Sequence, residues 1–162
     1  KVHVSPAPAG SRIFPRIIPK VHEKTMHTPW YETLVPNLLD LTLVEESNDT
    51  LRFLMPMDIA HSGMSLEELK SEAMSNLRQA SRHLIPQKDD LGIFRFEIGD
   101  GYDASRFLMI DYWFSNRHIW VAMPSRDSLW VLRGEPNPLH EQSLEEAYCD
   151  LPYPILGVWL HL

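Results

Sequence analysis

Cysteine is almost absent from this chain of 162 residues, since Cys149 is the only one. With a single thiol, no disulfide can form within the chain and no thiolate zinc site can be built from it alone. Cys149 lies between Tyr148 and Asp150 and has no basic neighbour in sequence that would activate it as a nucleophile. We therefore expect a small buried or inert thiol and, from the low cysteine usage, a cytoplasmic protein.

Long apolar runs are missing as well. A membrane-spanning helix needs about 20 consecutive apolar residues, and the longest apolar runs here are interrupted by Arg, Asp, Pro or Asn within a few positions. The first residues, KVHVSPAPAGSRIFPRIIPK, are basic and rich in proline but lack the apolar core of a signal peptide. We expect no membrane partner, and we interpret the start of the sequence, which is not Met, as a processed or tag-trimmed end.

Positively charged residues are fewer than negatively charged ones. The chain has 15 Lys and Arg residues against 22 Asp and Glu residues, which gives a formal net charge of -7. Nucleic-acid affinity depends largely on neutralising phosphates with basic side chains, so we expect no nucleic-acid partner. An acidic surface is instead suited to a basic protein partner. The residues indicate no oligomeric state.

Complete catalytic motifs are also lacking. The sequence has no Gly-x-Ser-x-Gly turn, no phosphate-binding glycine loop and no His-Glu-x-x-His pair. Its eight histidines are scattered, and the five-residue spacing of His22 and His27 is a weak metal-binding pattern. We predict no metal and no cofactor, and we favour a protein that is not an enzyme.

The overall amino-acid composition is typical of a globular domain. Hydrophobic residues make up 44% and charged residues 23% of the chain, which is too apolar for a disordered protein. We predict a flexible lead-in over residues 1–12 and a single α+β domain over residues 13–162. Its expected architecture is a mostly antiparallel sheet with an amphipathic helix packed on one face.

Helix signals occur at three places. The strongest is SLEELKSEAMSNLRQASRH, where Ser65 and Glu68 have capping-box spacing and apolar residues recur at helical intervals, which predicts a helix over 65–81. A second capping box, at Ser143 and Glu146, predicts a short helix in QSLEEAY. Thr28 followed by proline favours another short helix in HTPWYETLVP.

Strand signals occur between and after these segments. The prolines in IFPRIIPKV favour an edge or irregular strand. Alternation over residues 39–43 predicts a half-buried strand that forms a hairpin with LRFLMPM. GIFRFEIG predicts a further strand, HIWVAMP and DSLWVLRG predict a second hairpin, and YPILGVWLHL predicts a final strand. We expect both hairpins and the final strand to form one sheet.

The loop GDGYD, residues 99–103, contains two carboxylates among glycines and is the first candidate site. Carboxylates in such a loop are typical ligands of divalent cations, but the further ligands of a calcium-binding loop are missing. We favour a turn in which Gly101 has a positive φ and Asp103 caps a helix beginning at Ala104. The segment ASRFLMIDYWF fits either a buried helix or a strand, and we favour the helix.

The loop MPSRD, residues 123–127, is the second candidate site. Its arginine, Arg126, could hold an anionic ligand with two hydrogen bonds, or it could pair with a carboxylate such as Asp103 or Asp111 within the fold. We favour the structural pairing. The candidate functional residues of the two loops are Asp100, Asp103, Arg106, Arg126 and Asp127. The neighbouring aromatic residues Trp113, Phe114, Trp120, Trp130 and Trp159 are explained by core packing.

Three segments also carry a resemblance to a known family. They are SLEELKSEAMSNL, GDGYDASRFLMIDYW with its Asp-Ala-Ser-Arg run at 103–106, and VAMPSRDSLWVL with Met-Pro-Ser-Arg-Asp-x-Leu at 123–129. Together they resemble the YtpQ-like family of bacterial proteins, a domain of unknown function. The resemblance spans residues 14–162 in element order and is weakest in the amino-terminal part. It implies a cytoplasmic bacterial α+β domain and no established reaction, so no catalytic residues are carried over.

Two functions remain after these exclusions. The first is a non-enzymatic protein-binding or regulatory module with a basic partner, of which an immunity or antitoxin-like role is one instance. The alternative is a small metal-dependent hydrolase, which requires that the two candidate loops converge in space. Its residues would be Asp100, Asp103 and Asp127 with His118 or Arg126.

Overall fold

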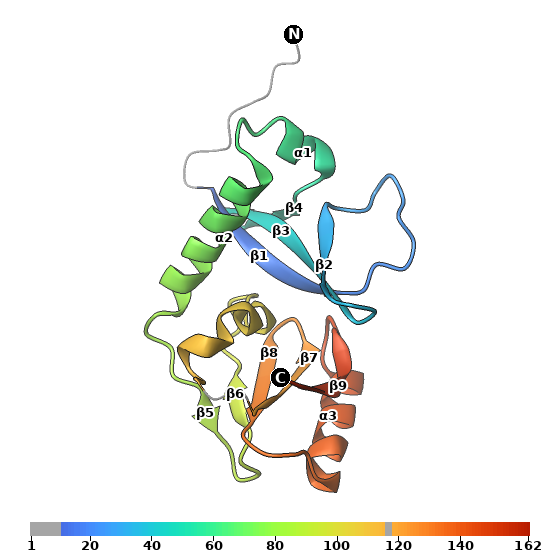
Figure 1. The fold of residues 1–162 in the computed structure, drawn as a ribbon, viewed down its shortest axis with the longest axis vertical. Helices are drawn as coiled ribbons and strands as arrows, with labels where there is room; N and C mark the ends of the chain where they lie inside the picture. The colour runs from blue at the N-terminus through green and yellow to red at the C-terminus, as the bar shows by residue number, and fades with distance from the viewer. Residues whose placement is uncertain (1–10, 116–117) are drawn as a thin grey trace. The chain divides into compact units, whose positions relative to one another are not determined.

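The computed structural model describes residues 11–115 and 118–162, and these residues group into two compact units. Of the described residues, the first unit comprises 11–16 together with Lys20–Ala80, and the second comprises Ile17–Pro19 and Ser81–Leu162. Helices and antiparallel sheets are both present, so the predicted α+β class is confirmed (Figure 1). Residues 1–10 of the expected flexible lead-in lie outside the described residues, and the first strand begins at Arg12.

The first sheet has four strands in the order β1-β3-β2, with β4 also paired to β3. The elements of this part of the chain are β1 (Arg12–Pro19), β2 (Tyr31–Val35), β3 (Leu39–Ser47), β4 (Thr50–Phe53), α1 (Pro56–Ala60) and α2 (Leu66–Ser81). The predicted hairpin of β3 with β4 is confirmed. The proline-containing β1 lies at the end of the strand order, as predicted, where proline is tolerated because one edge needs no backbone donors.

β3 lies in the interior of the first sheet, and residues 39–44 are all buried. The prediction of a strand with one solvent-exposed face is therefore wrong, because polar residues of β3 are enclosed too. The Asp40 carboxylate accepts the Val21 N–H at 2.7 Å, and the Thr42 hydroxyl donates to the Trp30 carbonyl at 2.6 Å. These hydrogen bonds offset the cost of burying the two polar side chains.

The segment predicted as a helix after Thr28 is a strand, β2, so that prediction is wrong. β2 pairs antiparallel with β3, with Tyr31 opposite Thr42 and Thr33 opposite Asp40. The Thr28 hydroxyl accepts the Thr25 N–H at 2.8 Å in a preceding turn and caps no helix. Pairing with a buried central strand outweighs the local helix signal of Thr-Pro.

α2 is the helix that the sequence predicts over 65–81. The Ser65 hydroxyl accepts the Glu68 N–H at 3.1 Å, as expected for the cap. Its buried stripe packs on one face of the first sheet (Figure 1). The packed cluster consists of Leu69 and Ala73 with Ile13, Leu43 and Leu54.

The second sheet has five strands in the order β5-β6-β8-β7-β9. Its unit contains β5 (Gln87–Lys88), β6 (Phe94–Phe96), the 3-10 helix η1 (Ala104–Tyr112), β7 (Trp120–Ser125), β8 (Ser128–Leu132), α3 (Pro138–Asp150) and β9 (Leu156–His161). The predicted second hairpin and final strand are confirmed. The expectation that both hairpins share one sheet is wrong, whereas a single folding domain over 13–162 stays a prediction.

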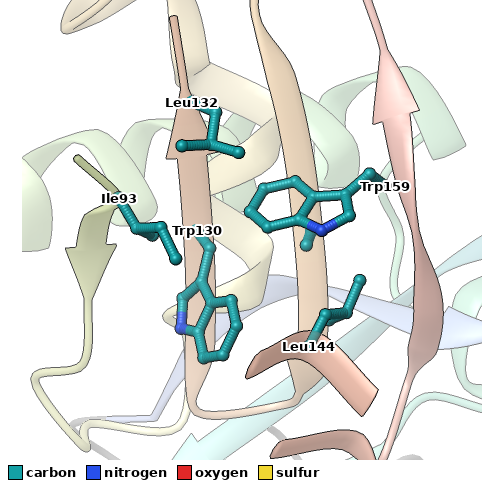
Figure 2. Close-up of a cluster of buried hydrophobic side chains, with 6 residues drawn as sticks. Ile93, Trp130, Leu132, Leu144 and Trp159 are labelled. Carbon is teal, nitrogen blue, oxygen red and sulfur yellow. The ribbon is translucent and has the colours of Figure 1, made fainter. Parts of the chain in front are cut away.

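Two tryptophans dominate the core of the second unit. Trp130 of β8 and Trp159 of β9 have ring centroids 6.2 Å apart, and Ala122 of β7 lies opposite Trp130. The small side chain of Ala122 leaves room for both indoles on this face of the sheet. Leu144 of α3 packs against them, as Figure 2 shows, so Trp130 and Trp159 serve core packing as predicted.

α3 begins five residues before its predicted cap. Asn137 is the N-cap residue: its side chain accepts the His140 N–H at 3.0 Å, while His140 Nδ1 accepts the Asn137 N–H at 3.0 Å. Pro138 occupies the first helical position. The prediction of a short helix capped by Ser143 is therefore wrong, because the Asn-Pro pair provides an earlier start and Ser143 lies within the helix.

We predict that Asn137→Ala destabilises the protein by about 1 kcal/mol, because the first turn of α3 loses its cap. Ser143→Ala is the control and should change the free energy of unfolding by less than about 0.5 kcal/mol. Urea denaturation followed by circular dichroism measures both. A larger loss for Ser143→Ala than for Asn137→Ala would contradict the assigned start of the helix.

Candidate functional site

The GDGYD loop follows β6 and turns on its two glycines. Gly99 and Gly101 have φ values of 81° and 90°, a region that residues with a side chain rarely adopt. The predicted positive φ of Gly101 is confirmed, and Gly99 shares it. The glycines thus shape a tight loop in which Asp100 and Asp103 come near each other, since both carboxylates contact the same arginine.

Asp103 is fully buried and does not cap η1. Its side chain makes no capping hydrogen bond, and its own backbone is already helical, with φ -57° and ψ -50°. One carboxylate oxygen instead accepts the Gly99 N–H at 2.8 Å, which closes the loop on itself. The prediction of an Asp103 cap is therefore wrong. The helix predicted to follow is present, as the 3-10 helix η1 rather than a regular α-helix.

Arg106 is the centre of the candidate site, and none of its side chain is exposed. Its guanidinium donates to both Asp100 oxygens, at 2.9 and 2.5 Å, and to Asp103 at 3.1 Å. Nε donates to the hydroxyl of Ser81, the last residue of α2, at 2.9 Å. A guanidinium stays charged in proteins, so its burial requires acceptors such as these.

Arg106 and burial act in opposite directions on the two carboxyl groups. Burial tends to raise the pKa of Asp100, but hydrogen bonds and charge from Arg106, with the Tyr102 N–H, hold that pKa below its usual value. For Asp103, burial is the largest influence and raises the pKa above its usual value despite the Gly99 N–H and Arg106. The nearby Asp100 charge also raises the pKa of Asp103.

The PSRD loop forms the turn between β7 and β8. Arg126 contacts the adjacent Asp127 at 3.4 Å, and its guanidinium lies 3.8 Å from the centre of the Tyr153 ring. The Arg126 N–H also donates to the Tyr153 carbonyl at 2.9 Å. A structural role for Arg126 was predicted, but the partners Asp103 and Asp111 were wrong: Asp103 is held by Arg106.

The two candidate loops meet through the main chain. The Ala104 N–H donates to the Arg126 carbonyl at 3.1 Å, so residues about 22 positions apart in sequence are neighbours at this point. The carboxylates of the two loops face different arginines: Asp100 and Asp103 bind Arg106, and Asp127 contacts Arg126. Sequence reasoning missed Arg106 as the organising residue, although Asp103 and Arg106 have the i, i+3 spacing of helical ion pairs.

His118 and Cys149 are the two other groups considered for catalysis in the sequence analysis. His118 and Cys149 are both exposed. Within residues 11–115 and 118–162, no three His, Cys, Asp or Glu side chains form a group that could hold a metal ion. Across the same ranges, no helix is both long enough and apolar enough to cross a membrane.

A pocket of about 390 Å³ in the second unit is lined by Leu84, Ile85, Gln87 and residues 95–98. Its arginine, Arg95, pairs with Asp89 at 2.8 Å and with Glu97 at 3.3 Å, and it lies over the Trp130 ring at 4.1 Å. Glu97 also accepts the Trp130 indole N–H at 2.9 Å. The charged groups of the pocket therefore bind one another, and none of the predicted site residues lines it.

Comparison with protein-family models, curated proteins and solved structures finds no match to this chain. Membership of the YtpQ-like family therefore stays a prediction based on the motifs at 103–106 and 123–129.

We predict that Arg106→Met destabilises the protein by about 3–5 kcal/mol, because it leaves Asp103 buried without its cation. The matched control is Arg82→Met, which removes an exposed arginine and should cost less than about 0.5 kcal/mol. Urea unfolding monitored by tryptophan fluorescence compares them. Equal stability of the two variants would show that Arg106 does not hold the loop.

The two carboxyl groups should affect the pH dependence of stability in opposite directions. Asp100, with a lowered pKa, stabilises the folded state above the ordinary carboxyl pKa of about 4, and this stabilisation is lost as the pH falls. Asp103, with a raised pKa, stabilises the folded state at low pH, and this stabilisation is lost as the pH rises through its folded pKa.

We therefore expect Asp100→Asn to reduce the loss of stability on acidification and Asp103→Asn to increase it. Urea denaturation at a series of pH values from neutral to acidic measures how the free energy of unfolding of each variant depends on pH. Each variant is the control for the other. A change of this pH dependence in the same direction for both variants would contradict the assigned pKa shifts.

Proposed function

We propose that this chain is a non-enzymatic protein-binding module whose partner is a basic polypeptide. An immunity-like role, in which the module neutralises a basic protein by binding it, is one instance of this function. Two features support the proposal: the loop carboxylates are engaged within the fold, and the exposed acidic groups of α3 form no ion pair among the described residues.

The loop carboxylates are engaged by the protein itself. Arg106 binds both Asp100 and Asp103, so neither offers the free oxygens that a metal-dependent hydrolase would need. Asp127 contacts Arg126. These pairs are those of a structural ion-pair network, and they favour the binding module over the hydrolase.

Acidic groups on α3 carry the proposal. Glu141, Glu145, Glu146 and Asp150 are all exposed. Among the described residues, no Lys or Arg forms an ion pair with any of them. The helix itself contains neither Lys nor Arg. With a net charge of -7 for the whole chain, this surface attracts positively charged partners and accelerates their association.

The YtpQ-like resemblance is compatible with this proposal and adds no reaction to it. Its two motifs contain Asp103, Arg106 and Arg126, which form contacts within the second unit. We propose that the residues of these two motifs are characteristic of the family because they shape the two loops.

We predict that the protein binds basic peptides in preference to neutral and acidic peptides of equal length. Fluorescence anisotropy with labelled peptides measures the dissociation constants, and added salt should weaken the basic complex because it screens exposed charges. A labelled DNA duplex is the control for nucleic-acid binding and should show none. Equal binding of all peptides, or binding of none, would contradict the proposed function.

A further inference from the structure

We propose that the outer edge of β9 binds an extended, basic segment of a partner protein as an added β-strand. The carboxylates of Glu141 and Glu145 on α3 would receive its Lys or Arg side chains. This inference rests on the proposed function and specifies where the basic partner binds and in which conformation.

β9 is the last strand in the order of the second sheet, and among the described residues no strand pairs with its outer edge. The Leu162 N–H donates to the Ile119 carbonyl at 3.0 Å, and Trp120 is opposite His161. Because antiparallel hydrogen bonds alternate along a strand, the amide of His161 points away from β7. It is therefore oriented toward an added strand.

The two edges of this sheet differ in how they are protected. β5, at the opposite end, has only two residues, one of which is Lys88. Short strands and edge lysines are common devices that prevent pairing with another chain. β9 has six residues, LGVWLH, without lysine or proline. The open edge of the sheet is therefore the β9 edge.

α3 presents Glu141 and Glu145 on the side of the helix near β9. A Cβ atom placed on Gly157 would lie 3.1 Å from the Tyr148 ring, so this tyrosine packs on the backbone of β9. Glu141, Glu145 and Tyr148 have i, i+4, i+7 spacing and share one face of the helix. Figure 1 shows α3 and β9 adjacent in the second unit, both in orange to red.

The negative charge of Glu141 and Glu145 beside β9 favours a basic segment as the bound strand. A second copy of the chain would bring the same glutamates to the interface, and like charges oppose such pairing. Lys or Arg residues in an extended segment point to one side at every second position and can reach the α3 carboxylates. Val158 and Tyr148 are 49% and 39% exposed and offer apolar contacts to such a segment. A basic strand with intervening apolar residues fits both features.

The test uses a labelled peptide of alternating lysine and valine, with a glutamate–valine peptide as the charge control. The double variant Glu141→Gln/Glu145→Gln should weaken binding of the basic peptide about three- to tenfold, as expected for two exposed ion pairs. Glu68→Gln/Glu72→Gln on α2 is the matched control, because it removes two exposed charges at the same i, i+4 spacing. It should leave the affinity within about twofold of the wild type.

A second pair of variants tests strand addition. His161→Pro removes the outward-facing donor, whereas His161→Ala removes the same imidazole and keeps the amide. We expect the proline variant to weaken binding at least about tenfold relative to the alanine variant. If circular dichroism shows that His161→Pro does not fold, a lysine–valine peptide methylated on alternate backbone nitrogens replaces it, and loss of its binding is the expected result.

The outcomes separate this inference from the proposed function. Binding of the basic peptide that neither the α3 variants nor the edge modifications weaken would overturn the β9 site and leave the proposed function standing. Absence of any basic-peptide binding would overturn both. Concentration-dependent dimerisation in analytical ultracentrifugation that His161→Pro abolishes would assign the edge to a second copy and overturn the basic occupant.

Discussion

The buried charge of Arg106 is the constraint on which the loops of the second unit depend. A guanidinium cannot lose its proton at ordinary pH, so its burial requires acceptors in fixed positions. Asp100 and Asp103 supply carboxylate oxygens, and Ser81 supplies a hydroxyl. The positive φ values of Gly99 and Gly101 let the chain turn tightly enough to place both aspartates around one side chain.

This constraint also determines what the loops can do. Carboxylates that neutralise a buried arginine are held by hydrogen bonds and are poor candidates for metal binding or proton transfer. Exposed acidic groups that form no ion pair among the described residues include Glu141 and Glu145 of α3, the helix that packs next to β9. The carboxylates that hold the buried arginine and the exposed carboxylates of α3 are thus different groups within the second unit.

Two local helix-start patterns in the sequence do not begin a helix in the structure, and both are overridden by stronger interactions. Thr28-Pro29 and Ser143 have the local pattern of a helix start, yet the first precedes β2 and the second lies inside α3. In each case a competing interaction is stronger: pairing with β3 for β2, and the Asn137 cap with Pro138 for α3. A capping signal identifies a possible helix start and does not decide between alternatives that differ in packing.

By itself, the sequence determined the α+β class, helix α2, both hairpins and the final strand, because these follow from capping pairs and hydrophobic periods within a few residues. It also identified the two loops that meet at Ala104 and Arg126. Only the tertiary structure decided the division into two sheets, the convergence of Asp100, Asp103 and Ser81 on Arg106, and the place of β9 as the last strand of its sheet among the described residues. These features join residues distant in sequence, and such pairings are selected by burial and hydrogen bonding across the fold, which local patterns do not encode.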